Sequence, residues 1–276
     1  MERAPRLIAS DIDGTFLDRN HRVTKRNRDV VVRAVAAGAH FALSTGRPFR
    51  WIAPVLDQLP LRPLCVTSNG AVIYDPAADA VVLAHELQPD TLAELADVAL
   101  TATARYGGVG FGAERAGASA SDAVDELFVV DPVYARNDIF MEGFGLHDLD
   151  VVTGSPAVKF IIRNPHLSSH ELYELIAPHV DAERAHVTYS MDDGLLEVAA
   201  PGVTKAHGVA WLADHYGVAR DEIVAFGDMP NDIEMLQWVG YGVAMGNAAD
   251  SVKEAADYVT EPNHQGGVAK VLERWF

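Results

Sequence analysis

The sequence predicts an α/β protein built around a parallel β-sheet, with an α+β module inserted in the middle of the chain. Towards both ends, short apolar runs alternate with segments of helical periodicity, which is the order of a parallel sheet with covered faces. Between about residues 84 and 190 the pattern changes to an Ala-rich helix, a glycine-rich patch and short strands, as expected of a separate module. With 276 residues, 49% of them hydrophobic, the chain can bury two cores of ordinary size.

The larger domain is expected at residues 1–83 and 191–276, and the inserted module at residues 84–190. The elements expected in the larger domain are, in chain order, a strand ending near residue 10, a helix at 23–37, strands at 39–43 and 64–67, a hairpin of 72–74 with 81–83, a strand at 195–198, a helix from 204 to about 216, a strand at 223–226, a helix from about 233, a strand at 241–244, a helix through 254, a short strand at 258–259 and a last helix. Ligands of such sheets bind beyond the carboxyl ends of the strands, so the residues that follow each strand are the candidates for a site.

Composition excludes several classes of function. The formal net charge of −17 argues against a sequence-independent grip on nucleic acid or on an anionic membrane surface. The first residues carry Arg3 and Arg6 before a very short apolar run, which does not fit a signal peptide, and no apolar stretch is long enough to span a bilayer. A single cysteine, Cys65, excludes an internal disulfide and a thiolate metal cluster, and is expected in the core at a strand end. We therefore expect a cytoplasmic protein.

Two carboxylates follow the first strand, at Asp11 and Asp13, and Gly14 allows the chain to turn there. Alternate residues of an extended backbone share a face, so both side chains could face one spot, and the carbonyl of Asp13 could be offered there as well. Two like charges at close range favour a bound cation, and Mg²⁺ prefers oxygen ligands. A turn whose carboxylates cap backbone N–H groups is the alternative. A calcium loop is excluded, because the twelfth position counted from Asp11 is Arg22 instead of a glutamate.

Thr45, Gly46 and Arg47 follow the second strand, directly before Pro48. The hydroxyl of Thr45 and the N–H groups around Gly46 would form a seat for phosphate oxygens at the mouth of a helix, whose first turn accommodates a proline. An ordinary helix cap is the alternative. Arg47 could bind a substrate anion or lie on the surface. Asn69 follows the third strand and is expected at the same edge of the sheet.

Lys205, Asp228 and Asp232 complete the candidate set. Lys205 follows a plausible N-cap, Thr204, and its charge faces the unfavourable positive end of a helix dipole unless a phosphate or carboxylate lies there. The alternative is a solvated surface lysine. Asp228 comes just after the strand at 223–226 and could supply a further metal carboxylate. For Asp232 the alternative is stronger, because an acid at the start of a helix is expected from capping and from the helix dipole alone.

These motifs, in this order, resemble those of the haloacid dehalogenase superfamily of phosphatases, specifically its Cof-type branch, subclass IIB. The resemblance covers nearly the whole chain and implies a Rossmann-like core with an α/β cap inserted between the second and third motifs. Met229-Pro230 departs from the branch, which often has a polar residue there, and we expect an altered loop shape with metal binding retained. The matching stretches are Asp11-Ile12-Asp13-Gly14-Thr15, Thr45-Gly46-Arg47, Lys205, Gly227-Asp228-Met229-Pro230-Asn231-Asp232, Ser68-Asn69-Gly70-Ala71 and Met245-Gly246-Asn247-Ala248.

The resemblance implies an Mg²⁺-dependent phosphomonoester hydrolase that acts on small phosphorylated metabolites, such as sugar phosphates or phosphorylated cofactors. Asp11 would be the nucleophile that forms an aspartyl-phosphate, and Asp13 the acid and base. Mg²⁺ would be held by Asp11, the backbone carbonyl of Asp13 and Asp228, with Asp232 supporting the metal side of the site. The implied substrate- or phosphate-binding residues are Thr45, Gly46, Arg47, Asn69, Lys205 and Asn231.

Three other functions use similar residues. A phosphosugar mutase of the same superfamily would use the same acids and return the phosphate to the sugar. A non-catalytic phospholigand-binding protein would not need Asp13 beside Asp11, and a signalling receiver module would be far shorter than this chain. Within residues 84–190 no motif points to one substrate.

Overall fold

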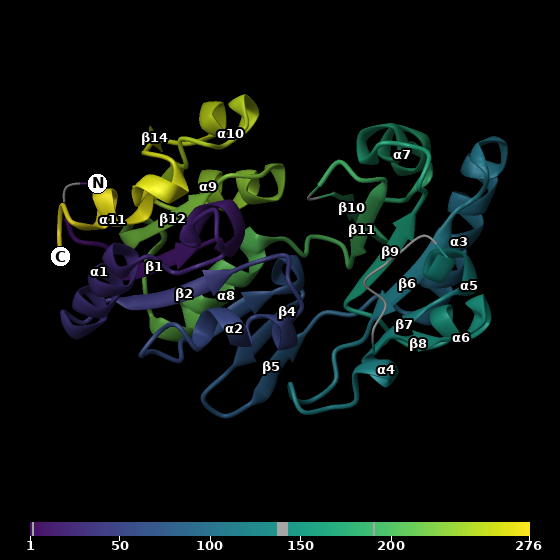
Figure 1. Ribbon diagram of the computed structural model, residues 1–276, viewed down its shortest axis with the longest axis horizontal. Coiled ribbons are helices and arrows are strands. Elements are labelled where there is room, and N and C mark those ends of the chain that lie inside the picture. Colours follow the sequence, from purple (N-terminus) through teal and green to yellow (C-terminus); the bar gives the residue numbers. More distant parts are fainter. Residues whose placement is uncertain (2, 137–142, 190) are drawn as a thin grey trace. The chain divides into compact units, whose positions relative to one another are not determined.

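The computed structural model describes residues 1, 3–136, 143–189 and 191–276, and it divides the chain into two compact units (Figure 1). Unit 1 consists of Met1–Val82 and Thr204–Phe276, and unit 2 of Leu83–Val203. Each unit is built on a β-sheet of its own. The predicted fold class, an α/β core with an α+β insertion, is therefore confirmed.

The sheet of unit 1 has eight described strands, in the order β14-β13-β12-β1-β2-β3-β4-β5. The central strand β1 pairs in parallel with both β2 and β12, and its residues are fully buried, as expected for a strand covered on both faces. Strand β4 turns back and pairs antiparallel with β3. The strands are β1 Leu7–Ser10, β2 His40–Ser44, β3 Cys65–Thr67, β4 Val72–Asp75, β5 Ala80–Ala84, β12 Ile223–Gly227, β13 Tyr241–Ala244 and β14 Tyr258–Val259.

The helices of unit 1 pack in pairs, α1 with α11 and α8 with α9. The spacing of Val30, Val31, Ala34 and Val35 predicts an apolar stripe on α1, and the first three are fully buried whereas Val35 is partly buried. The side chain of Thr24 accepts a hydrogen bond from the first turn of this helix. The helices are α1 Lys25–Ala36, α2 Ala53–Leu56, α8 Lys205–Tyr216, α9 Ile233–Trp238, α10 Asp250–Ala255 and α11 Gly267–Leu272.

One predicted helix is much shorter than expected. The helix that was to begin at Pro48 is a single 3-10 turn, Phe49–Trp51, followed by the four-residue α2. Pro54 lies in the first turn of α2, where a missing N–H is tolerated, but Pro60 and Pro63 follow soon after α2 and lack the N–H that would continue a helix. The residues after β2 therefore form a loop and not the mouth of a long helix.

Unit 2 contains a sheet of six described strands, in the order β10-β11-β9-β6-β7-β8. Its main core joins side chains of β6, β9 and β11, such as Phe111, Phe160 and Leu196, to apolar faces of α3 and α7. The capping residue Ser168 makes a reciprocal pair of hydrogen bonds with Glu171 at the start of α7. The strands are β6 Gly110–Glu114, β7 Phe128–Val130, β8 Gly145–Leu146, β9 Lys159–Arg163, β10 His186–Thr188 and β11 Leu195–Ala199, and the helices are α3 Pro89–Thr103, α4 Val124–Leu127, α5 Pro132–Arg136, α6 Leu149–Thr153 and α7 Ser169–Ile176.

The strand at 195–198, expected in the larger domain, belongs to unit 2. It is β11, which pairs antiparallel with β9 and with β10, so residues 191–203 lie with unit 2 and the core resumes only at Thr204. An apolar strand pattern shows that a segment pairs, but not with which neighbour. The prediction that placed this strand and residues 191–203 in the core was wrong for that reason.

Candidate active site

The site of unit 1 begins where β1 ends, at Asp11. The N–H of Asp11 donates to the carbonyl of Phe226 in β12, which continues the pairing of β1 with β12. The carbonyl of Asp11 accepts a hydrogen bond from the N–H of Phe16 at 3.2 Å, and this bond closes a tight turn over Ile12–Phe16. Within this turn Gly14 has a φ of +75°, a left-handed conformation that favours glycine. The predicted turn therefore directs the chain back over the tip of the sheet.

Asp228 lies against this turn from the neighbouring strand β12. The Thr15 hydroxyl donates to Oδ1 of Asp228 at 2.8 Å, and the amide of Asn247 donates to the carbonyl of Gly14 at 2.9 Å and to Oδ2 of Asp228 at 3.3 Å. A Cβ added to Gly14 would lie 2.1 Å from Oδ2 of Asp228. Glycine is thus required at position 14 both by its backbone conformation and by the closeness of this carboxylate.

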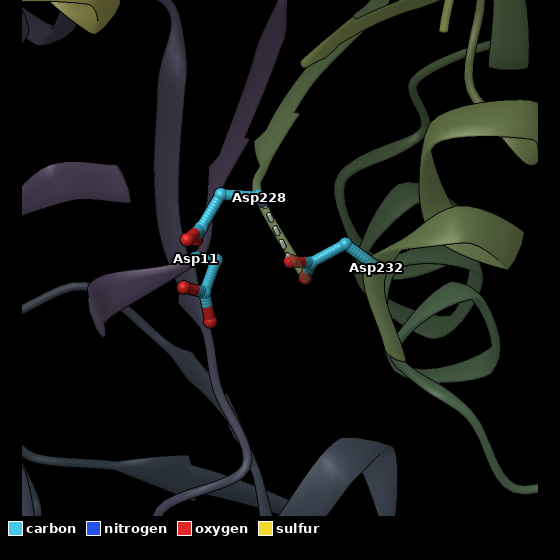
Figure 2. A group of neighbouring side chains, drawn as sticks. All are labelled: Asp11, Asp228 and Asp232. Carbon is cyan, nitrogen blue, oxygen red and sulfur yellow. Dashed lines mark hydrogen bonds between the residues drawn. The ribbon is translucent and has the colours of Figure 1, made fainter. Parts of the chain in front are cut away.

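Three buried carboxylates gather at the carboxyl edge of the sheet, those of Asp11, Asp228 and Asp232 (Figure 2). One ligand oxygen of each lies within 4.8 Å of the others. Figure 2 shows the side chains of Asp11 and Asp228 extending next to each other from adjacent strands, whereas Asp232 approaches from the following segment. Oδ2 of Asp232 accepts hydrogen bonds from the N–H groups of Asp228 and Met229 at 2.9 and 3.0 Å, so this carboxylate holds the loop in shape.

Lys205 supplies the positive charge of this group. Its Nζ lies 2.7 Å from Oδ1 of Asp11 and 2.7 Å from Oδ1 of Asp232, and its side chain is only 2% exposed. Thr204 caps the helix by accepting from the N–H of His207. Lys205 is thus a buried partner of carboxylates and not a solvated surface lysine.

Burial raises the pKa of Asp11 well above its usual value; Lys205 opposes this effect, and the nearby Asp232 and Asp228 add to it. Burial likewise raises the pKa of Asp228 to about 6, although the hydrogen bond from Thr15 works against it. Burial alone would lower the pKa of Lys205, but the charges of Asp11 and Asp232 outweigh it and raise that pKa. Three carboxylates thus share one ammonium group, and a bound cation would relieve the remaining repulsion.

The predicted phosphate seat lies on the loops after β2 and β3. Thr45 is buried, and its hydroxyl accepts from the N–H of Arg47 at 3.1 Å. Gly46 lies so close to Asn69 that an added Cβ would be 3.0 Å from the amide oxygen of Asn69. That oxygen also accepts from the amide of Asn231 at 3.0 Å. Thr45, Gly46, Asn69 and Asn231 are therefore connected side by side.

Arg47 makes a contact that the sequence did not indicate. Its Nε donates to Oδ2 of Asp13 at 2.6 Å, and a terminal guanidinium nitrogen donates to Oδ1 at 2.5 Å. Asp13 is the most open of the predicted acids, with a side chain 45% exposed, and within the described residues it is not a member of the buried carboxylate group. The two acids of the turn thus have separate surroundings, since Asp11 faces Lys205 and Asp13 faces Arg47.

Sequence reasoning missed the parts played by Thr15 and Asn247, both of which hold Asp228. Asn247 was quoted in a turn typical of the Cof-type branch, but it received no role. A signal was available, because Asn247 follows β13, and β13 pairs in parallel with β12. Its side chain is therefore expected at the same carboxyl edge as Asp228.

Comparison with known proteins agrees with this architecture and this arrangement of acids. The family model described as haloacid dehalogenase-like hydrolase matches residues 8–272. The chain therefore belongs to this family of hydrolases, and it is a phosphatase of the Cof-type branch.

Two relatives in sequence are similar over the whole length. The chain is 30% identical to the 5-amino-6-(5-phospho-D-ribitylamino)uracil phosphatase YitU of Bacillus subtilis (strain 168), with 100% of this chain and 99% of the relative covered. It is also 30% identical to a putative phosphatase of Haemophilus influenzae, with 98% of each covered.

Solved structures show the same fold. A haloacid dehalogenase-like hydrolase from Bacteroides thetaiotaomicron has a TM-score of 0.75 and 25% identity, covering 99% of this chain and 100% of that one. The sugar phosphatase BT4131, of subclass IIB, has a TM-score of 0.76 and 22% identity, with 98% of each chain covered.

Among the described residues, no helix is both long and apolar enough to cross a bilayer.

Proposed function

We propose that the protein hydrolyses small phosphate monoesters with the help of Mg²⁺ and through a phosphorylated Asp11. The observation that carries this proposal is the setting of Asp11 at the tip of β1. Lys205 fixes one carboxylate oxygen at 2.7 Å, and the second oxygen accepts no hydrogen bond from the described part of the chain. Such a carboxylate is oriented as a nucleophile, with one oxygen held and the other available.

The residues present fit a divalent cation such as Mg²⁺. The carboxylates of Asp11 and Asp228 are hard oxygen donors at the ends of adjacent strands, with one oxygen of each within 4.8 Å of the other. Burial, the main cause of the raised pKa of both groups, disfavours their ionised forms, and a bound cation would offset that effect. Asp232 is already engaged with Lys205 and two backbone N–H groups, so we assign it a supporting part. Asp11, Asp228 and the carbonyl of Asp13 would hold the cation, which would neutralise charge on the transferred phosphoryl group.

Asp11 and Asp13 would divide the chemistry between them. Attack of an Asp11 oxygen on phosphorus forms one O–P bond and breaks the ester P–O bond, while the carboxyl of Asp13 gives its proton to the leaving oxygen. The Asp13 carboxylate then takes a proton from water, whose oxygen attacks phosphorus and breaks the bond to Asp11. Inorganic phosphate leaves, and both carboxyl groups return to their starting states.

The remaining residues would bind and orient the phosphoryl group. Thr45 and the N–H of Gly46 would contact its oxygens, while Lys205 would neutralise both the phosphate and Asp11. Asn69 and Asn231 lie next to this seat and would orient the ester. Catalysis would then depend chiefly on position and charge.

The relatives suggest the class of ester. YitU is named for a phosphorylated ribitylamino compound, and BT4131 is described as a sugar phosphatase. We propose that this protein also acts on the phosphate of a sugar, a sugar alcohol or a related cofactor precursor. The described part of unit 2 contains no feature that restricts this class further.

A phosphatase panel tests the proposal. Wild-type protein with Mg²⁺ is expected to release inorganic phosphate from sugar and sugar-alcohol phosphates, and Asp11→Asn to lose at least about 10⁴-fold in turnover because it lacks the nucleophile. Brief reaction followed by peptide mass spectrometry should find phosphate on Asp11. Phosphate on another residue, or phosphate moved within the sugar and not released, would contradict the proposal.

A further inference from the structure

We propose that Arg47 is a positioning residue for Asp13 and not a contact for the substrate phosphate. This inference rests on the proposed function, because it concerns how the proposed acid and base is held. It differs from the role that the family resemblance implies, in which the arginine beside Thr45 and Gly46 binds the substrate or its phosphate. The contacts of Arg47 in the structure carry the new assignment.

The guanidinium of Arg47 meets Asp13 in a fork. Two of its nitrogens donate to the two different oxygens of the carboxylate, at 2.6 and 2.5 Å. The third nitrogen lies 3.4 Å from the carbonyl of Trp51. A bidentate fork fixes the plane of a carboxylate as well as its distance, which a single point charge does not do.

Hydrogen bonds hold both the N–H and the carbonyl of Arg47. Its N–H donates to the hydroxyl of Thr45 at 3.1 Å, and its carbonyl accepts from the N–H of Ser68 at 2.9 Å. The side chain therefore starts from a fixed point on the loop after β2 and reaches the turn after β1. Asp13, by contrast, lies in a turn with a glycine beside it and has a side chain 45% exposed, so it needs an outside partner to keep one orientation.

A carboxylate has about four lone-pair positions, and a fork of two donors occupies only two of them. Arg47 can therefore hold Asp13 while a lone pair remains for the proton that Asp13 gives and takes. His21 also faces Asp13, with Nδ1 3.9 Å from Oδ1, but this distance exceeds that of a hydrogen bond. Arg47 is thus the residue whose contacts define the orientation of Asp13.

This assignment predicts an effect that depends on the leaving group. A sugar alkoxide needs a proton as it leaves, whereas 4-nitrophenolate does not. Arg47→Met is expected to lower kcat/KM for a sugar phosphate by about 10²-fold, with KM nearly unchanged, because a misplaced catalytic group costs about that much. With 4-nitrophenyl phosphate the variant should still release a rapid first equivalent of nitrophenolate and then turn over slowly, since Asp13 also activates the water.

Three comparisons make the test specific. In an Asp13→Ala background, Arg47→Met should cause no further loss, because two residues that act through one group are not additive. Arg47→Lys keeps the charge but not the fork, and should recover only part of the rate. Arg26 forms the same kind of fork with Glu273 elsewhere in unit 1, with contacts of 2.9 and 2.5 Å, so Arg26→Met is the matched control and should leave both substrates unaffected.

Several results would overturn the inference. If Arg47→Met lowers kcat/KM equally for both substrates and raises KM, Arg47 is a phosphate contact. The same conclusion follows if Arg47→Met causes its full loss of kcat/KM in the Asp13→Ala background as well. Full rescue by Arg47→Lys would show that charge alone is sufficient. If the wild type hydrolyses neither substrate, the proposed function itself fails. If the wild type is active, Asp11→Asn is inactive and the substrate ratio of Arg47→Met is unchanged, only this inference fails.

Discussion

Each unit of the protein buries a lysine next to a carboxylate, and the two lysines are set differently. In unit 2, Lys159 of β9 forms an ion pair with Glu197 of the neighbouring strand β11, with both side chains 10% exposed or less. Both residues lie within strands whose backbones are paired on either side. In unit 1, Lys205 lies between two carboxylates, a third is close by, and all three acids follow the ends of strands.

Lys159 and Lys205 differ in the groups that surround their ammonium charges. The ion pair of Lys159 and Glu197 joins two neighbouring strands within a sheet, and such a pair can specify which strands lie together. A lysine at the edge of a parallel sheet faces loops, where several strand ends bring acids to one place. We therefore interpret Lys159 as a structural residue of unit 2 and Lys205 as a working residue of the site. The following predictions test this contrast, from the largest effect to the smallest.

The largest effect is expected for Lys205→Met. Loss of the ammonium group leaves Asp11 without its partner and leaves the phosphoryl charge uncompensated, so kcat should fall by about 10³-fold. Steady-state phosphate release measures this, with circular dichroism to verify that the variant is folded. A folded Lys205→Met variant with nearly normal kcat would remove the contrast between the two lysines.

Gly14→Ala tests whether the turn after β1 has room for a side chain beside Asp228. The added Cβ would meet Oδ2 of Asp228 at 2.1 Å and would displace that carboxylate, which should lower both Mg²⁺ affinity and kcat by about 10²-fold. Titration calorimetry and kinetics measure the two quantities.

Gly38 is the matched control for Gly14→Ala. It also has a positive φ, of +94°, but nothing lies within 4 Å of an added Cβ. Gly38→Ala should therefore cost only about 1 kcal/mol in backbone strain and leave activity unchanged. Equal activity losses in the two variants would show that strain, and not the contact with Asp228, is responsible.

Lys159→Met is expected to affect stability and not chemistry. It removes the ammonium group that pairs with the buried carboxylate of Glu197, so the free energy of unfolding should fall by about 3 kcal/mol, while kcat of the folded protein stays unchanged. Adding Glu197→Leu should restore most of this loss, because replacing both members of a buried pair by apolar groups is often nearly neutral. Urea unfolding of the wild type, the single variant and the double variant measures these differences. A double variant less stable than the single one would argue against a simple ion pair.

The smallest effect is a pH-dependent stabilisation by Mg²⁺. Without metal, the pKa of Asp228 is raised to about 6 in the folded protein, so between about pH 4 and 6 the folded site holds a proton that the unfolded chain has released. The contribution of Asp228 to the free energy of unfolding therefore falls as the pH rises from about 4 through 6. Mg²⁺ needs the ionised carboxylate. It should raise the unfolding temperature by about 5 °C at pH 7.5 and by much less at pH 5.

Thermal unfolding with Mg²⁺ or with a chelator measures this shift. Asp228→Asn is the control and should show almost no response to Mg²⁺ at either pH. An equal response of the wild type at both values of pH would contradict the assignment of Asp228 as a ligand.

The sequence by itself determined much of the core and of the site. The alternation of apolar runs with helical segments correctly predicted the parallel sheet, and acids, hydroxyls and a lysine placed after strands indicated a site at its carboxyl edge. Cys65 is buried at the start of β3, and its pKa is raised to about 12 by that burial, in agreement with a core residue. These inferences succeed because strand periodicity and the succession of strands and helices along the sequence are local properties of a chain.

Only the tertiary structure decided which partners these residues have. The pattern at 195–198 was the same whether that strand joined unit 1 or unit 2, and pairing with β9 settled it. Arg47 and Asp13 are 34 positions apart, and Asn247 is 233 positions from Gly14, so no local signal joins them. Hydrogen bonds between strand ends depend on the order of strands in the sheet and on the loops between them. The kinds of chemistry were therefore readable in the sequence, while the different partners of the two acids, Lys205 for Asp11 and Arg47 for Asp13, came from the fold.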